Sequence, residues 1–207
     1  MKHIPDTIYT IGHSTHSLEY FLELLQAHHI TCLVDVRSLA ASRYNPQYNK
    51  DTFSAFLKGN GIQYLHFGYE FGARQTAAEL LDHEGQLDFE KVRNASHFKK
   101  GVDRLQQGIA KGYTIALMCA ESEPLDCHRF GMVAVALARN GFDVLHILKD
   151  KTLKSNATLE QDLLKKYAKK LPTADIFTPA ISHDTQLAAA YRLLNKDIAY
   201  APGELDE

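Results

Sequence analysis

The sequence predicts an α/β fold with three layers: a mostly parallel, five-stranded sheet with helices on both faces and a C-terminal helical extension. Two observations predict it. Short apolar runs alternate with amphipathic helical patterns along the first 150 residues, and the pattern becomes purely helical after Lys149. Strands that alternate with helices need crossover connections, which favours a parallel sheet covered on both sides. The composition, 45% hydrophobic and 23% charged, is that of an ordinary globular protein.

Five short apolar runs are the predicted strands. They comprise residues 8–11, 31–36, 62–67, 113–118 and 142–148. Each is bounded by glycine or polar residues, which is typical of buried strands.

The segments between these runs carry helical patterns. Ser17 is a suitable N-cap for a helix in which Leu18, Phe21, Leu22 and Leu25 recur at helical spacing. Further helices are predicted around residues 51–58, from 92 to 109 and from 127 to 140, while residues 68–88 look irregular.

The chain is expected to divide into an α/β core over residues 1–150 and a helical extension over residues 151–207. Leucines at helical spacing predict two helices in the extension, and the Lys169-Lys170-Leu171-Pro172 stretch separates them. A segment this short would be marginally stable alone, so we expect it to pack on the core.

Charge and cysteine content restrict the location and the partners. The formal net charge of −2 and a pI near 6.6 argue against bulk electrostatic binding to nucleic acid or anionic lipid, although a single nucleotide or a flipped base could bind locally. No apolar stretch has membrane-spanning length and no signal-peptide core is seen, so neither a membrane partner nor export is expected. Three cysteines, an odd number, indicate a reducing compartment, and we expect a cytoplasmic location.

Polar residues of reactive types follow several predicted strands. His13 and Ser14 follow the first, Asp35 and Arg37 close the second, and Cys119 with Glu121 follows the fourth. Ligands bind outside the carboxyl ends of strands in open parallel sheets. The sequence therefore predicts one site at this edge of the sheet.

Residues 119–129 hold the candidate catalytic residues. Asp126 is a suitable N-cap, which would place Cys127, His128 and Arg129 in the first turn of a helix. The positive potential there binds anions and lowers the pKa of a thiol, so Cys127 is a plausible thiolate and His128 an acid or base. Cys119 is an alternative nucleophile beside Glu121 or His128. Both cysteines could also be small buried core residues.

Arginines at the strand ends and in the following loops suggest that the ligand carries an anionic group such as phosphate or carboxylate. Substrate binding is therefore assigned to His13, Ser14, Asp35, Arg37, Arg43 and Arg129.

A metal site is a separate possibility. Cys119, Glu121, Cys127 and His128 are competent ligands, and His13 could add another. Their spacing is not that of a zinc finger or zinc ribbon, so no metal ligands are assigned. The sequence identifies no cofactor.

The same residues carry a family resemblance. Thr10-Ile11-Gly12-His13-Ser14, Asp35-Val36-Arg37 with Ser42-Arg43, Gly61-Ile62-Gln63-Tyr64, and Cys119-Ala120-Glu121 with Cys127-His128-Arg129 occur in this order. The pattern resembles the domain of unknown function 488 family over roughly residues 8–148. The resemblance implies a compact cytosolic α/β protein in which the matched residues form one site, and it brings no established reaction.

The Asp35-Val36-Arg37 strand end is also similar to that of rhodanese-like domains. Those domains use a catalytic loop with the spacing Cys-x5-Arg, but Leu125 stands six residues after Cys119. Sulfur transfer and phosphatase chemistry are therefore disfavoured.

These observations predict an enzyme that acts on a small anionic or nucleotide-like substrate at the sheet edge, using a cluster of Cys, His, Glu and Arg. Two alternatives stay open: a non-catalytic ligand-binding or regulatory module with an anion pocket, and a metal-dependent hydrolase. The sequence does not indicate the oligomeric state.

Overall fold

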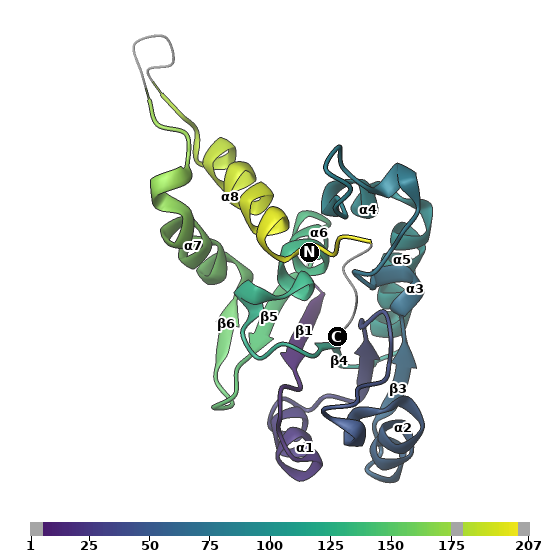
Figure 1. Ribbon diagram of the computed structural model, residues 1–207. Helices are drawn as coiled ribbons and strands as arrows, with labels where there is room; N and C mark the ends of the chain where they lie inside the picture. The colour runs from purple at the N-terminus through teal and green to yellow at the C-terminus, as the bar shows by residue number, and fades with distance from the viewer. Residues whose placement is uncertain (1–5, 175–179, 203–207) are drawn as a thin grey trace.

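A six-stranded sheet forms the centre of the molecule in the computed structural model, which describes residues 6–174 and 180–202 (Figure 1). Its strands are β1 (Thr7–Gly12), β2 (Cys32–Asp35), β3 (Gln63–His66), β4 (Ile115–Cys119), β5 (Asp143–Ile147) and β6 (Leu153–Ser155). They lie in the order β3-β2-β4-β1-β5-β6, and all neighbours are parallel except β5 and β6.

The five predicted strands are confirmed, but the predicted number of strands is wrong. The sixth, β6, pairs antiparallel with β5 and contains only Leu153, Lys154 and Ser155. A strand this short and this polar has no recognisable apolar pattern. The sheet therefore continues past residue 150, where the core was expected to end.

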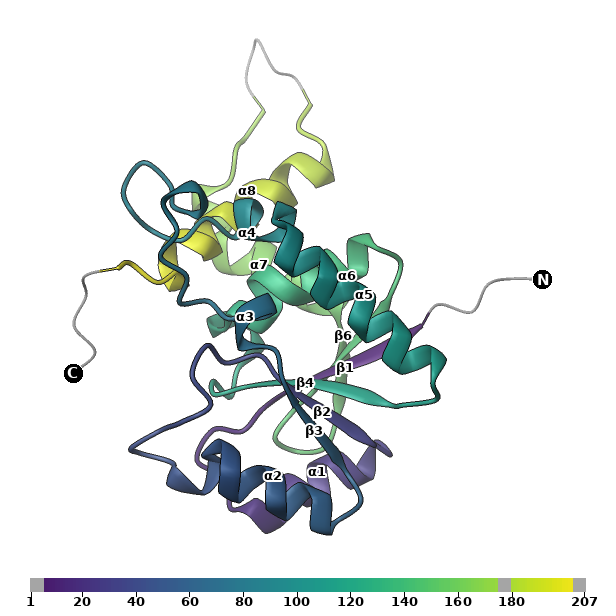
Figure 2. The same cartoon turned by 90° about the vertical axis from the view of Figure 1, so that its right-hand side faces the viewer.

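Helices cover both faces of the sheet, which confirms the three layers (Figure 2). On one face lie α1 (Leu18–Ala27) and α2 (Lys50–Gly59). On the other lie α3 (Gly68–Phe71), α4 (Phe89–Asn94), α5 (Ser96–Ala110), α6 (Val135–Arg139), α7 (Asn156–Tyr167) and α8 (His183–Ile198). Among the residues described, no helix is both long enough and apolar enough to cross a membrane.

Alternation along the strands divides the core between the two faces, because successive side chains of a strand point to opposite sides. Leu33 and Met118 pack with the residues of α1 and α2. Val34, Leu117 and Cys119 pack in the larger cluster under α5 to α8. Cys119, the last residue of β4, therefore faces the side from which α6 approaches.

Two helical predictions need correction. Residues 68–88, expected to be irregular, contain α3 and a 3-10 turn over residues 78–80. The single helix expected from 92 to 109 is interrupted at Ala95, whose extended backbone (ψ 149°) separates α4 from α5. The N-cap at Ser17 is confirmed, since its hydroxyl accepts a hydrogen bond of 3.2 Å from the Tyr20 N–H.

Buried polar contacts fasten the C-terminal helices to the sheet. His146 on β5 bonds Thr10 on β1 through Nδ1 (2.8 Å) and the side chain of Asn156 at the start of α7 through Nε2 (3.3 Å). Tyr191 on α8 donates to Glu160 on α7 (3.0 Å). Burial, with the charge of Arg129, lowers the pKa of His146 to about 3, so the imidazole is neutral at pH 7. Residues 175–179 and 203–207 of the predicted extension lie outside the described residues.

Candidate functional site

The carboxyl ends of β1, β2 and β4 meet at one edge of the sheet. Gly12 pairs with Cys119, and Asp35 pairs with Met118. Beyond the strands the pairing continues, because the backbone N–H of His13 donates to the carbonyl of Cys119 (2.9 Å) and that of Ser14 to Ala120 (2.9 Å). The parallel register thus brings together residues that are more than 100 positions apart.

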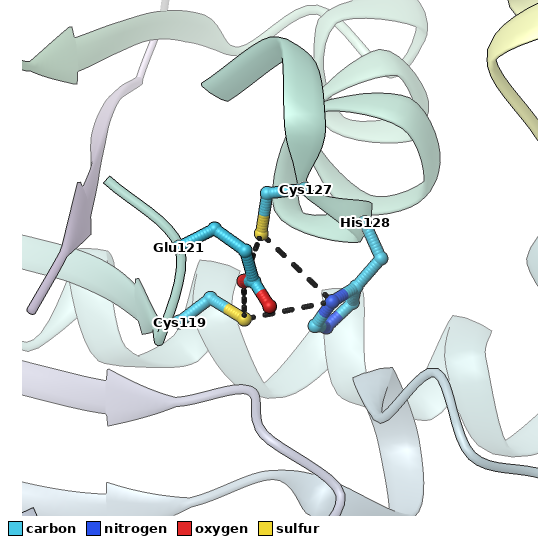
Figure 3. A group of neighbouring side chains, drawn as sticks. All are labelled: Cys119, Glu121, Cys127 and His128. Atoms are coloured by element: carbon cyan, nitrogen blue, oxygen red, sulfur yellow. Dashed lines mark hydrogen bonds between the residues drawn. The ribbon is translucent and has the colours of Figure 1, made fainter. Parts of the chain in front are cut away.

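Four reactive side chains converge here (Figure 3). Cys119 Sγ and Cys127 Sγ each lie 2.9 Å from Glu121 Oε2. His128 Nδ1 lies 3.5 Å from Cys119 Sγ and 3.9 Å from Cys127 Sγ. One ligand atom from each of the four residues lies within 4.8 Å of every other, so the group could hold a metal ion. We call Cys119, Glu121, Cys127 and His128 the four-residue cluster.

Cys127 has an extended backbone and directly precedes the helix, although it was predicted to lie in the first helical turn. Asp126 was expected to cap the helix, but it belongs to a 3-10 turn over Pro124–Asp126, so this prediction is wrong. Helical structure begins at His128, and its opening segment over Arg129–Ala134 is a π-helix, a feature often found at functional sites. The Cys127 sulfur accepts a hydrogen bond from the Arg129 N–H (3.4 Å).

His128 is oriented by the backbone of the segment after β2. Its Nε2 lies 3.2 Å from the Val36 carbonyl oxygen. A carbonyl only accepts hydrogen bonds, so Nε2 carries a proton and Nδ1 is the ring atom that faces the two sulfurs.

The two thiols are expected to differ in charge. Burial acts to raise the pKa of Cys127, but hydrogen bonding to Cys119 and the charges of Arg129 and His128 outweigh it and lower the pKa well below the usual range. Burial and the neighbouring Cys127 raise the pKa of Cys119 well above its usual range. The predicted thiolate is therefore Cys127, and Cys119 is the neutral thiol.

The other two members share protons with these thiols. Burial and the charge of Cys127 raise the pKa of Glu121. Burial opposes the protonated form of His128, but its hydrogen bond to Cys127 outweighs that cost and raises the pKa of His128. The four groups therefore titrate together, and the charge of the cluster belongs to the group and not to any one residue.

Arg129 supports the site from below. Its side chain is 0% exposed and donates from Nη1 to the Glu121 carbonyl (2.5 Å) and from Nη2 to the Ser122 carbonyl (2.8 Å). It does not line the cleft, so we reassign this predicted substrate-binding residue to positioning the loop that carries Glu121.

Asp35 also lies beneath the site. Its buried carboxylate accepts hydrogen bonds from Arg37 Nη2 (2.6 Å), Arg37 Nε (2.9 Å) and the Tyr64 hydroxyl (2.7 Å). Arg37 in turn reaches His13 Nε2 (3.3 Å), and the His13 ring stacks on Tyr48 at 4.1 Å. Burial lowers the pKa of His13 to about 4, so this histidine is neutral at pH 7. Asp35 therefore positions Arg37 and has no exposed surface for a substrate.

A cleft of about 860 Å³ opens above the cluster. Among the predicted site residues, those that line it are His13, Ser14, Arg37, Cys119, Glu121 and His128. Cys127 lies below its floor, and Arg43 is not part of its lining.

One wall of the cleft was not foreseen from the sequence. It consists of residues 197–200 at and beyond the end of α8. The Leu87 N–H donates to the Tyr200 carbonyl (2.9 Å), and Arg74 lies over the Tyr200 ring at 5.9 Å. No local pattern marks these residues, because only the packing of α8 on the core brings them to the sheet edge.

The fold and the site define a class: an α/β protein with a cysteine, histidine and carboxylate cluster at the carboxyl edge of a mostly parallel sheet. The family model described as domain of unknown function DUF488 matches residues 17–136, more than half of the chain, and the chain belongs to this family. The match contains the whole four-residue cluster but neither His13 nor residues 197–200. No curated protein and no solved structure matches the chain.

Proposed function

We propose that the protein is an enzyme that acts on a small anionic substrate, such as a phosphate ester or a nucleotide, bound in the cleft over the four-residue cluster. The supporting observation is the convergence of two thiols, a carboxylate and an imidazole within 4.8 Å at the floor of a cleft. Titratable groups gathered in a partly buried site cost stability, and such groupings concentrate at functional sites. A cleft of about 860 Å³ is of the size that small molecules occupy.

The charged residues around the cleft suggest how a bound substrate is oriented. Arg37 and Arg74 lie on one side, where the Ser38 hydroxyl accepts a hydrogen bond from the Arg74 backbone N–H (2.8 Å). Glu121, Asp126 and Asp197 also line the cleft. An anionic group of the substrate is therefore expected beside the arginines and hydroxyls, with the reacting atoms over Glu121.

Glu121 is the member of the cluster best placed for proton transfer. The Glu121 residue is exposed and lines the cleft, whereas Cys119 and Cys127 are buried, and its carboxylate reaches inward to contact both sulfurs. A group that touches both the cleft and the cluster can move a proton between a bound substrate and the site.

Glu121→Gln is expected to abolish turnover without disturbing the fold. The amide keeps the size of the side chain but cannot take up a proton, so kcat should fall by about 10²–10⁴-fold while ligand affinity and Tm stay near those of the wild type. A panel of phosphate esters and nucleotides would be screened for turnover. Glu123→Gln is the matched control, an exposed glutamate two residues away and outside the cleft lining. Binding without turnover in the wild type would contradict an enzyme and favour the ligand-binding module.

Arg74→Ala is expected to weaken the binding of inorganic phosphate about tenfold, which corresponds to one charge-assisted hydrogen bond of about 1.4 kcal/mol. Arg43→Ala removes a similar loop arginine that does not line the cleft, and it should leave the affinity unchanged. Titration calorimetry would measure both. Equal losses in the two variants would mean that phosphate is held by general surface charge and not in the cleft.

A further inference from the structure

We infer that the four-residue cluster is a zinc site, in which Cys119 Sγ, Cys127 Sγ and His128 Nδ1 hold the ion and Glu121 is the exchangeable fourth ligand. This inference deepens the proposed function, because it names the cofactor of the same site. Two cysteines and one histidine with an open or exchangeable fourth position form a known type of catalytic zinc site. The sequence spacing, which matches neither a zinc finger nor a zinc ribbon, had counted against a metal.

The distances between the ligand atoms suit a tetrahedral ion. Zinc binds thiolate sulfur at about 2.3 Å and imidazole nitrogen at about 2.0–2.1 Å, which places a sulfur and a nitrogen ligand about 3.5 Å apart. His128 Nδ1 lies 3.5 Å from Cys119 Sγ and 3.9 Å from Cys127 Sγ. Both nitrogen-to-sulfur distances are therefore close to the distance that a tetrahedral zinc site needs, although the ligands come from a strand end and a helix start.

The carboxylate is closer to the sulfurs than a fourth ligand would be. Glu121 Oε2 lies 2.9 Å from each sulfur, at hydrogen-bond distance. An ion that replaces the shared protons would move this oxygen outward by about half an ångström, since sulfur and oxygen ligands of zinc also lie about 3.5 Å apart. Glu121 is the exposed residue of the four and lines the cleft, which is why it is assigned as the exchangeable ligand.

Hydrogen bonds from backbone groups keep His128 and Cys127 in the protonation states that metal binding needs. The Val36 carbonyl accepts from His128 Nε2 (3.2 Å), which leaves Nδ1 free to coordinate. The Arg129 N–H donates to Cys127 Sγ (3.4 Å), as backbone amides do to electron-rich sulfur. Both contacts come from backbone groups, so they are independent of neighbouring side chains.

The buried charge of Arg129 balances such a site. Two thiolates, one carboxylate and Zn²⁺ sum to a charge of −1, and the guanidinium adds +1. Arg129 is 0% exposed, its Nε has no hydrogen-bond partner, and within the described part of the chain it forms no salt bridge with a carboxylate. A fully buried cation requires a nearby negative charge. The Cys127 thiolate supplies one in the metal-free cluster, and the zinc-bound cluster would keep the same net charge of −1.

Metal content and cobalt spectroscopy of the whole chain test the inference. The purified protein, dialysed against Zn²⁺ and then against buffer, should retain one zinc per chain, and Co²⁺ should give tetrahedral absorption with thiolate-to-metal charge transfer. Cys127→Ser and Cys119→Ser should each weaken zinc binding by more than about 100-fold, since losing even an outer contact costs about 10–100-fold. Cys32→Ser, which removes the cysteine in β2, is the matched control and should bind zinc like the wild type.

Alkylation of the wild type keeps the test independent of how the variants fold. Iodoacetamide should label Cys119, which lines the cleft, only after a chelator has removed the ion, while labelling of Cys32 should not depend on the chelator. Glu121→Gln should keep its zinc, about 10-fold more weakly bound, while losing turnover.

A wild-type chain that takes up no zinc and gives no cobalt spectrum overturns the zinc site, even if its turnover upholds the enzyme. One zinc per chain with no turnover on any substrate upholds the zinc site and overturns the proposed enzyme.

Discussion

Replacing Asp35 with asparagine is expected to lower the free energy of unfolding by about 3–5 kcal/mol, because it leaves the buried Arg37 guanidinium without its counter-charge. Asp35 is 0% exposed. Both of its carboxylate oxygens accept hydrogen bonds, from the backbone and side chain of Arg37 and from the Tyr64 hydroxyl. Either orientation of an asparagine amide would therefore turn an NH₂ group toward a donor. Chemical denaturation would measure the loss.

A surface carboxylate provides the control for this prediction. Asp162 pairs with Lys154 (3.2 Å) and Lys165 (3.3 Å) where all three side chains are solvent-accessible. Asp162→Asn should therefore cost less than about 1 kcal/mol. Similar losses for Asp162→Asn and Asp35→Asn would show that burial does not set the strength of the Asp35–Arg37 pair.

Replacing Gly12 with alanine is expected to distort the site directly. A Cβ at this position would overlap the Glu121 backbone carbonyl and lie 3.1 Å from Arg129 Nη1. The loop that carries Glu121 must then move away from the end of β1, at a cost of about 1–3 kcal/mol. Because Cys119 and Glu121 belong to this segment, zinc binding and turnover should fall together. Denaturation, zinc titration and turnover would be measured on one preparation.

Gly59 provides the matched control. It lies in α2, and a Cβ there would meet no atom within 4 Å. Gly59→Ala should therefore leave the site unchanged and raise stability by less than about 1 kcal/mol, because glycine costs about 0.5–1 kcal/mol relative to alanine in mid-helix and Gly59 is the last residue of α2. If Gly12→Ala bound zinc like Gly59→Ala, the close approach of the Glu121 carbonyl to β1 would not be needed for the site.

Local sequence patterns predicted most of the architecture, because the formation of strands and helices depends largely on residues that are close together in the chain. Apolar runs and helical spacing located five strands and both faces of the sheet. They did not reveal β6, since Leu153-Lys154-Ser155 carries too little apolar signal. They also placed Asp126 as a helix cap, because a local pattern does not show that Pro124–Asp126 form a separate turn.

The segment around Cys119 and Cys127 shows where the sequence stops being informative. By itself, the sequence determined that Cys119, Glu121, Cys127 and His128 would lie at the carboxyl edge of a parallel sheet, since the ends of parallel strands share one edge. Only the tertiary structure decided that Arg129 and Asp35 point inward as supports, that Arg43 stands apart, and that residues 197–200 close the cleft. Burial and close approach depend on how distant elements such as α8 and the sheet pack together, and no local pattern encodes that packing.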